Sequence, residues 1–379
     1  MNIEQALQQA IAHHQADEPL AAEQLYRAIL TEEPKHPDAN HNLGLLMMQQ
    51  DQTDDALAFF TNALNANPNT IQFWVSYIDA LIYTEQFDVA ENILKQGRSN
   101  GLEGAAFDQL DILLASAIKK AQLTSLQAEI DSVLALYANG QIQETLNVLQ
   151  GLHITYPDTA IFYNLSGACY TDLGQPDIAV KHYQRALEIK PDYAEAHFNL
   201  GITLNELGQS DAAIKSFERL LVIEPNYAKG HHCLGVTFKD LGQFDAAVNS
   251  FGQALAINPD YAEAHNNLGV TLQELGLLDA AVKSFGQALT INPDYAKAHY
   301  NLGNTLKDLD QLSAAIRSYE QALAIIPNYV EAYANLGITH HEHGQLDAAV
   351  KSFEQALAIN PDYIEAHSNL GLTLKELGQ

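Results

Sequence analysis

Apolar residues recur along most of this chain at the spacing of amphipathic helices. Ala213 and Phe217, four residues apart, are one example, and the alanine of this pair returns every 34 residues from Ala179 to Ala349. Residues three and four apart lie on one face of a helix, whereas a strand would need an alternating pattern. The pattern therefore predicts a chain made of helices.

Prolines divide the chain into units of equal length. When the proline is counted as repeat position 32, glycine falls at position 8, alanine at position 20, and Tyr or Phe at position 24. Pro34 and Pro68 show the same spacing near the start. Such self-similarity predicts an array of stacked repeats. The seven prolines that stand 34 residues apart are Pro157, Pro191, Pro225, Pro259, Pro293, Pro327 and Pro361.

Each repeat reads as two antiparallel helices. Small residues at positions 8 and 20 let the two backbones approach, and the aromatic residue at position 24 fills the space beside them. Gly208 at position 15 can adopt the left-handed conformation that ends the first helix. Asp211 favours the start of the second helix electrostatically, and proline at position 32 stops it.

These motifs resemble the 34-residue tetratricopeptide repeat over nearly the whole chain. The resemblance implies an all-α fold, a right-handed superhelical α-solenoid of tandem helix-turn-helix units. Ten full units and a final half-unit from Ile364 to Gln379 are expected. The full units begin near Ile3, Pro37, Ile71, Leu126, Ala160, Ala194, Ala228, Ala262, Ala296 and Val330.

The stretch from 103 to 122 does not fit the 34-residue count. We expect one unpaired helix there, from Ala105 to Ala121, between an N-terminal block of three units (1–102) and a main array (123–379) of seven units plus the half-unit. An array needs a polar terminal cap, and Leu370 and Leu374 would lie partly uncovered at the end. We therefore expect the chain to be part of a longer protein.

A row of asparagines at position 6 marks a candidate binding surface. Positions 2, 6, 9 and 13 form one stripe of the first helix, which should line the concave face of a curved array. The carboxamide both donates and accepts, so a row of them can pair with the backbone of an extended peptide. The alternative is that each asparagine braces the neighbouring helix. The row consists of Asn199, Asn267, Asn301, Asn335 and Asn369, with Asn42 in the first block and Cys233 as an interruption.

The phrase from Ala262 to Gly269, repeated from Ala296 to Gly303, resembles the repeats of O-GlcNAc transferases and bacterial SPINDLY-like proteins. In that family an asparagine ladder holds substrate polypeptides, and the resemblance assigns this role to the five position-6 asparagines. The N-terminal phrase from His13 to Leu30 resembles bacterial proteins that place such repeats before a glycosyltransferase, sulfotransferase or methyltransferase. None of these catalytic modules is recognisable in this sequence.

Carboxylates at position 13 lie on the same stripe and should favour basic ligands. Tyr300 at position 5 adds aromatic surface. The alternative is a solvated acidic face that only keeps the protein in solution. The row is Glu206, Asp240, Glu274, Asp308, Glu342 and Glu376.

Composition narrows the classes of function. The chain has 379 residues, with 47 Asp plus Glu against 19 Lys plus Arg and a net charge of −28, which would repel nucleic acid. No apolar run is long enough for a membrane span, and only Cys169 and Cys233 are present, so we expect a cytoplasmic protein. No P-loop, dinucleotide fingerprint or catalytic motif occurs, so we expect no enzyme activity, no cofactor and no metal. His197 and its equivalents at position 4 are interpreted as packing residues.

The sequence thus predicts a module that binds extended polypeptide segments, basic ones in particular, through the asparagine ladder, as the recognition region of an O-GlcNAc-transferase-like protein. A scaffold that self-associates through exposed ends or the extra helix is the alternative.

Overall fold

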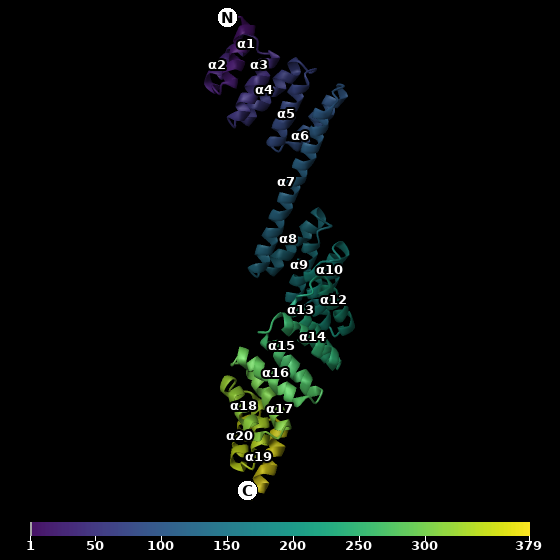
Figure 1. The fold of residues 1–379 in the computed structure, drawn as a ribbon, viewed down its shortest axis with the longest axis vertical. Helices are drawn as coiled ribbons and strands as arrows, with labels where there is room; N and C mark the ends of the chain where they lie inside the picture. Colours follow the sequence, from purple (N-terminus) through teal and green to yellow (C-terminus); the bar gives the residue numbers. More distant parts are fainter. Residues whose placement is uncertain (1) are drawn as a thin grey trace. The chain divides into compact units, whose positions relative to one another are not determined.

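The computed structural model describes residues 2–379, and these form helices without any strand. The chain divides into two compact units, Met1–Ser132 and Val133–Gln379. Figure 1 shows helix pairs following one another within each unit. The predicted all-α solenoid of tandem helix pairs is confirmed.

The first unit contains three helix pairs and most of a long helix. Each first helix begins at the residue expected from the sequence, at Ile3, Pro37 and Ile71. The pairs are α1 (Ile3–Gln15) with α2 (Pro19–Glu32), α3 (Pro37–Gln49) with α4 (Thr53–Ala66), and α5 (Ile71–Tyr83) with α6 (Phe87–Ser99).

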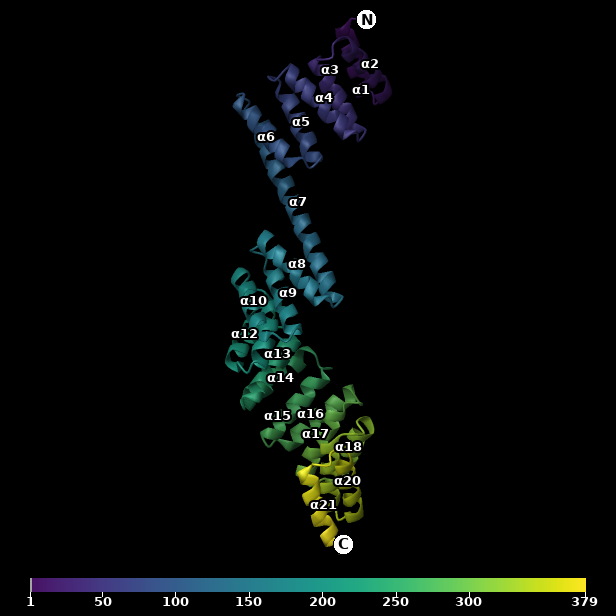
Figure 2. The ribbon, with the colours of Figure 1, turned by 180° about the vertical axis from the view of Figure 1, so that it is seen from behind.

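The prediction of a separate helix ending at Ala121 is wrong. Figures 1 and 2 show one uninterrupted helix, α7 (Ala105–Ala138), which contains 34 residues. It joins the extra segment to the first helix of the repeat expected near Leu126. Residues 105–138 include neither glycine nor proline, so no residue in the segment favours a helix end. The boundary between the compact units falls inside this helix, after Ser132.

The second unit continues with regular helix pairs. Every first helix from Ala160 onward begins at the expected residue. The helices are α8 (Ile142–Thr155), α9 (Ala160–Asp172), α10 (Pro176–Ile189), α11 (Ala194–Glu206), α12 (Ser210–Ile223), α13 (Ala228–Asp240), α14 (Phe244–Ile257), α15 (Ala262–Glu274), α16 (Leu278–Ile291), α17 (Ala296–Asp308), α18 (Leu312–Ile325), α19 (Val330–Glu342), α20 (Leu346–Ile359) and α21 (Ile364–Glu376).

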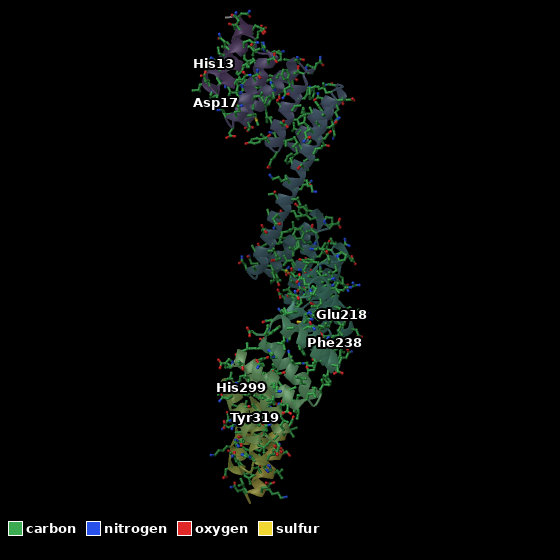
Figure 3. The ribbon with its side chains drawn as sticks, in the orientation of Figure 1. His13, Asp17, Glu218, Phe238, His299 and Tyr319 are labelled. Atoms are coloured by element: carbon green, nitrogen blue, oxygen red, sulfur yellow. The ribbon has the colours of Figure 1, made fainter. Side chains whose placement is uncertain are left out.

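The predicted packing of glycine against an aromatic ring is confirmed within each complete repeat from 160 onward. A Cβ atom added to Gly303 would lie 2.6 Å from Cε1 of Tyr319, so only glycine permits this approach. Tyr319, labelled in Figure 3, is fully buried on α18. The equivalent pairs are Gly167–Tyr183, Gly201–Phe217, Gly235–Phe251, Gly269–Phe285 and Gly337–Phe353.

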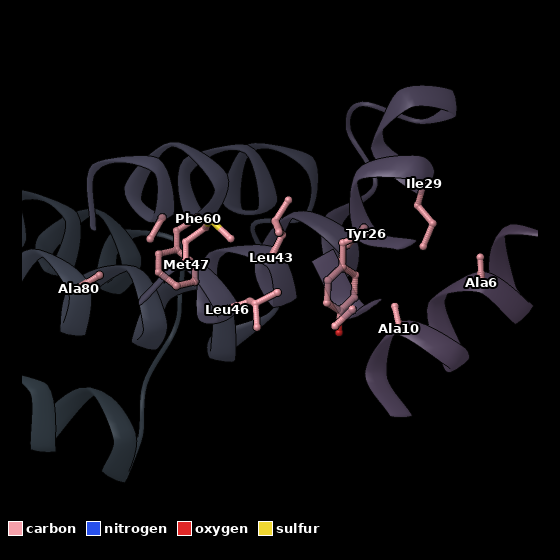
Figure 4. Packing of buried hydrophobic residues seen from close by; sticks show 12 residues of the cluster. Ala6, Ala10, Tyr26, Ile29, Leu43, Leu46, Met47, Phe60 and Ala80 are labelled. Atoms are coloured by element: carbon pink, nitrogen blue, oxygen red, sulfur yellow. The ribbon is translucent and has the colours of Figure 1, made fainter. Parts of the chain in front are cut away.

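The first unit has its own apolar core. Figure 4 shows Tyr26, Leu43, Met47 and Phe60 among the residues packed between α1, α2, α3 and α4. All four are at most 1% exposed. The first repeat of the unit is therefore packed against the second.

The connection inside most repeats uses glycine with a positive φ. Gly276 has φ +73°, but the equivalent residue one repeat later is Asp310, with φ +58°. A side chain in this left-handed region costs roughly 1–2 kcal/mol, although aspartate tolerates it better than most residues. Replacing Asp310 removes that strain.

We expect Asp310→Gly to raise the free energy of unfolding by about 0.5–1 kcal/mol, since glycine loses more backbone entropy on folding and this offsets part of the gain. Denaturant unfolding measures the change. The reciprocal variant Gly276→Asp should be destabilised, and a destabilised Asp310→Gly protein would contradict the argument.

Candidate functional site

The second unit curves toward its first helices. Each first helix from α9 to α19 contacts the next first helix as well as its own partner, whereas successive second helices of this unit make no such contact. Elements that meet their equivalents lie on the inner side of a curved stack. The stripe of positions 2, 6, 9 and 13 therefore belongs to the concave side, and we call it the groove.

The position-6 asparagines of the groove are half-buried and bonded to the preceding repeat. In four cases Nδ2 donates to the side chain at position 5 of that repeat, 35 residues earlier. The bonds are Asn199 to Asn164 Oδ1 (3.2 Å), Asn267 to His232 Nε2 (2.9 Å), Asn301 to Asn266 Oδ1 (3.0 Å) and Asn335 to Tyr300 OH (3.1 Å). Asn335 also donates to Asn304 Oδ1 at 2.9 Å.

These contacts give the asparagines at position 6 a role in the packing between repeats. The interpretation as a brace, left open from the sequence, describes the amide nitrogen atoms. The carbonyl oxygens are different, because within residues 2–379 none of the four Oδ1 atoms accepts a hydrogen bond. The Nδ2 atoms of these four asparagines therefore hold adjacent repeats together, whereas their Oδ1 atoms have no donor among the described residues.

His232 shows how the network fixes a protonation state. Its Nε2 accepts from Asn267, and its Nδ1 lies 3.3 Å from the hydroxyl of Tyr261. Burial lowers the pKa of His232, so the neutral ring with its proton on Nδ1 fits both contacts. The same brace occurs in the first unit, where His41 Nε2 lies 2.9 Å from Ser76 Oγ.

The brace is missing where the ladder is interrupted. Phe198 stands at position 5 before Cys233, and Lys229 Nζ lies 5.2 Å above the Phe198 ring. Asn369 follows Ala334 and makes no side-chain hydrogen bond within residues 2–379. Asn369 is therefore the ladder residue with no bracing role in the described chain.

The position-13 carboxylates are exposed, and some of them join a second line of contacts between repeats. Tyr137 OH donates to Asp172 at 2.8 Å and Gln273 Nε2 donates to Asp308 at 3.2 Å. His341 Nε2 lies 3.2 Å from Glu376. Asp240 pairs with Lys239 on its own helix at 3.2 Å. Glu206, Glu274 and Glu342 form neither hydrogen bonds nor ion pairs within residues 2–379, so they remain open to a ligand.

Tyr300 contributes less to the groove than its sequence position suggested. Its hydroxyl accepts from Asn335, and its ring packs 5.0 Å from the ring of Tyr329 and 6.1 Å from that of Tyr319. It is half-buried. The structure thus gives Tyr300 a packing contact, and its contact with a ligand stays a prediction.

The histidines at position 4 bond to the backbone. Nε2 of His299 donates to the carbonyl oxygen of Pro293 at 2.9 Å. His299 is labelled in Figure 3. His197, His231, His265 and His367 make the same bond to the preceding proline. The bond ties a first helix to the preceding turn, as the packing interpretation expects.

A second polar cluster lies between α8 and α10, the second helices of two adjacent repeats. His153 Nε2 lies 3.0 Å from Ser166 Oγ, and the ring centroids of His153 and His182 are 6.1 Å apart. Burial lowers the pKa of His153 to about 4, with a smaller contribution from His182, whose own pKa is also lowered by burial. Both rings are therefore neutral at pH 7.

We expect this pair to make stability depend on pH. Below the ordinary pKa of 6.5, His153 and His182 become protonated in the unfolded chain but stay neutral in the folded protein. The free energy of unfolding should therefore fall as the pH drops toward about 4. The variant His153→Leu/His182→Ser carries the residues that later repeats have at these positions. Its free energy of unfolding should therefore fall less between neutral and acidic pH than that of the unmodified protein. Denaturant unfolding at about pH 7 and about pH 5 gives the free energy of unfolding of the variant and of the unmodified protein. An equal loss of stability between the two pH values in both proteins would contradict the assignment.

Within residues 2–379, no helix combines the length and apolar character needed to cross a bilayer.

Models of one protein family match the chain along both units. A model described as TPR repeat matches residues 167–208, 237–276, 274–310, 303–344 and 339–378. Two models described as Tetratricopeptide repeat match residues 13–74 and 194–227. Together they cover more than half of the chain.

Curated relatives share only part of their length with this chain. A peroxisomal targeting signal receptor of Kluyveromyces lactis is 23% identical over 193 residues, which is 47% of this chain and 34% of the receptor. The chain thus spans about a third of the length of the curated relatives it matches.

Two solved structures resemble the fold. The C-terminal part of a TPR repeat-containing protein from Cytophaga hutchinsonii is 17% identical with a TM-score of 0.54, covering 64% of this chain and 99% of that one. A chain of the APC/C hetero-tetramer Cut9–Hcn1 is 14% identical with a TM-score of 0.51, covering 98% and 90%.

Proposed function

Because the chain belongs to the tetratricopeptide repeat family, we propose that its groove binds extended polypeptide segments of partner proteins. The observation that supports this most directly is a row of four half-buried asparagines, Asn199, Asn267, Asn301 and Asn335, whose Oδ1 atoms have no donor in residues 2–379. An extended backbone offers N–H groups that such acceptors can bind.

Charge supports a basic ligand. The exposed carboxylates of Glu206, Glu274 and Glu342 lie on the same stripe as the asparagines, in a chain of net charge −28. Oppositely charged segments approach such a surface faster at low salt. Binding should therefore weaken as salt rises.

The binding test separates ligand contact from bracing. We expect Asn267→Ala/Asn301→Ala/Asn335→Ala to lower the affinity for an extended basic peptide at least tenfold, about 1.4 kcal/mol. The probe is an array of unstructured peptides that differ in net charge, followed by fluorescence anisotropy on the best binder. An affinity equal to that of the unmodified protein would remove the ladder from the proposal.

Asn266→Ala is the matched control. It breaks the same brace as Asn301→Ala but keeps Asn301 in the groove, so both variants should lose about 0.5–1.5 kcal/mol of stability. Only Asn301→Ala should weaken binding. If Asn266→Ala weakened it equally, the asparagine would act through packing alone.

We further propose that this chain is the recognition region of a larger O-GlcNAc-transferase-like protein of the cytoplasm. Support comes from the repeated phrase from Ala262 to Gly269 and Ala296 to Gly303, and from two cysteines that form no disulfide. The titratable groups of the groove are spread one per repeat, so we propose binding and not catalysis for these residues. The coding sequence that follows Gln379 tests the assignment, and a downstream glycosyltransferase module is expected.

Self-association is the alternative, and exposed apolar residues favour it. Ile112 on α7 is 63% exposed and Ile364 on α21 is 83% exposed. Light scattering at increasing concentration distinguishes the two functions, because a scaffold should grow in mass and a recognition arm should not.

A further inference from the structure

A pocket of about 300 Å³ lies in the second unit, and none of its lining residues stands at groove position 2, 6, 9 or 13. Second helices α8 and α10 form its walls and first helix α9 lies between them. The amides of Gln143, Asn147, Gln150 and Gln175 line it, and none of its lining residues carries a formal charge at neutral pH.

The pocket exists because this place in the array departs from the chain's own repeat. Position 28 and position 7 of the next repeat are a pair of leucines in all later repeats, as in Leu221 and Leu234, but here they are His153 and Ser166. The two exchanged residues contact each other, with 3.0 Å between Nε2 and Oγ. Ser166 is 1% exposed. A polar pair thus replaces an apolar one at coupled positions.

A second pair departs in the same way. Position 23 is serine in the five following repeats and His182 here, while position 11 is mostly leucine and is Tyr170 here. The two rings stack, with centroids 5.1 Å apart and planes 25° from parallel. His182 is also 6.1 Å from His153. Both exchanged pairs therefore line one pocket.

Two further lining residues on α8, Gln143 and Asn147, which we call the rim of the pocket, also differ from the residues of the later repeats. Positions 18 and 22 hold an acid and a base in four later repeats, as Asp177 and Lys181, Asp211 and Lys215, Asp279 and Lys283, and Asp347 and Lys351. In α8 the same positions hold Gln143 and Asn147. The exchange removes the formal charges and leaves groups that both donate and accept.

The cost of these exchanges points to a ligand. Leucine burial is lost, and the Nδ1 atoms of His153 and His182 are buried without a hydrogen-bond partner. Unpaired buried polar atoms are uncommon in folded proteins and call for a specific explanation. Residues that break the pattern of a repeat at such a cost are expected at functional sites.

The chemistry of the lining selects the class of ligand. An anion would find no cation in the lining, a cation would find no carboxylate, and an apolar ligand would leave the amides without partners. The volume lies at the lower end of small-molecule sites. We propose that this pocket binds a neutral, hydroxyl-rich small molecule of monosaccharide size, independently of the peptide groove.

The experiment uses neutral sugars as probes. Glucose, galactose, mannose and N-acetylglucosamine are titrated at millimolar concentrations into the full chain, and binding is followed by saturation-transfer NMR. We expect at least one of them to bind. The proposal is overturned if none binds, or if only the charged probes glucosamine and glucose 6-phosphate do.

Two variants locate the binding. His153→Leu/Ser166→Leu/Tyr170→Leu/His182→Ser restores the residues of the later repeats and should lower the affinity at least tenfold. Gln143→Asp/Asn147→Lys restores only the rim, leaves the buried residues intact and should also weaken binding. Unchanged affinity in both folded variants would overturn the assignment, and the rim variant decides alone if the fourfold variant does not fold.

Discussion

Truncation of Phe285 to alanine should lower the free energy of unfolding by about 3–5 kcal/mol, the usual cost of removing a large aromatic side chain from a core. Phe285 is fully buried on α16 and fills the space that Gly269 leaves open on α15. No neighbouring side chain can fill that space without the backbone moving. The resulting cavity weakens the contact that joins the two helices of the repeat.

The loss should be local at first. In an array each repeat contacts only its neighbours, so stability is close to a sum of repeat and interface contributions. Hydrogen exchange should accelerate most in α15 and α16, and denaturant unfolding should report the total change.

Gly286→Ala, one residue after Phe285, is the control. Apart from its chain neighbours and the nearby backbone of α16, a Cβ there would meet no atom of residues 2–379 within 4 Å, so this variant should gain about 1 kcal/mol from the better helix propensity of alanine. A Phe285→Ala protein as stable as the control would contradict the packing argument.

Gly269→Ala should destabilise the protein by about 1–3 kcal/mol, although alanine is the better helix former, because the core has no room for the added carbon. Its Cβ would lie 2.6 Å from Cε1 and 2.8 Å from Cδ1 of Phe285. The ring cannot swing into solvent because it is buried on all sides. The helices must therefore separate or the ring must leave its rotamer.

Gly371→Ala tests the same repeat position without the ring. Apart from its chain neighbours and the nearby backbone of its own helix, no atom of residues 2–379 lies within 4 Å of a Cβ at Gly371, so that variant should gain about 1 kcal/mol. A double variant, Gly269→Ala/Phe285→Leu, should recover part of the stability. Thermal unfolding measures all three, and a loss at Gly371 equal to that at Gly269 would show that helix propensity, and not the clash, governs position 8.

In the asparagine row the two polar atoms of one side chain differ in role. A carboxamide carries its donors on nitrogen and its acceptor on oxygen, and the array uses the donors of Asn199, Asn267, Asn301 and Asn335 for bracing. A signal for this was present in the sequence. Position 5 is polar before each of these asparagines but is Phe198 before Cys233.

Local patterns in the sequence determined where nearly every helix begins and ends. Gly276 ends one first helix with φ +73°, and each first helix from Ala160 onward begins at its expected residue. Such features depend on the backbone preferences of single residues and on the spacing of apolar side chains. The absence of glycine and proline from residues 105–138 also contained the evidence for the continuous α7, which the repeat count obscured.

Only the tertiary structure decided which side chains meet across repeats. The bond from Asn301 to Asn266 joins residues 35 positions apart. The pocket brings together His153 and His182, which are 29 positions apart. Whether such groups meet depends on how adjacent repeats rotate and pack, and no local preference specifies that. The sequence therefore determined the helical array and its register, whereas the packing between repeats determined which polar groups are used internally and which remain for a ligand.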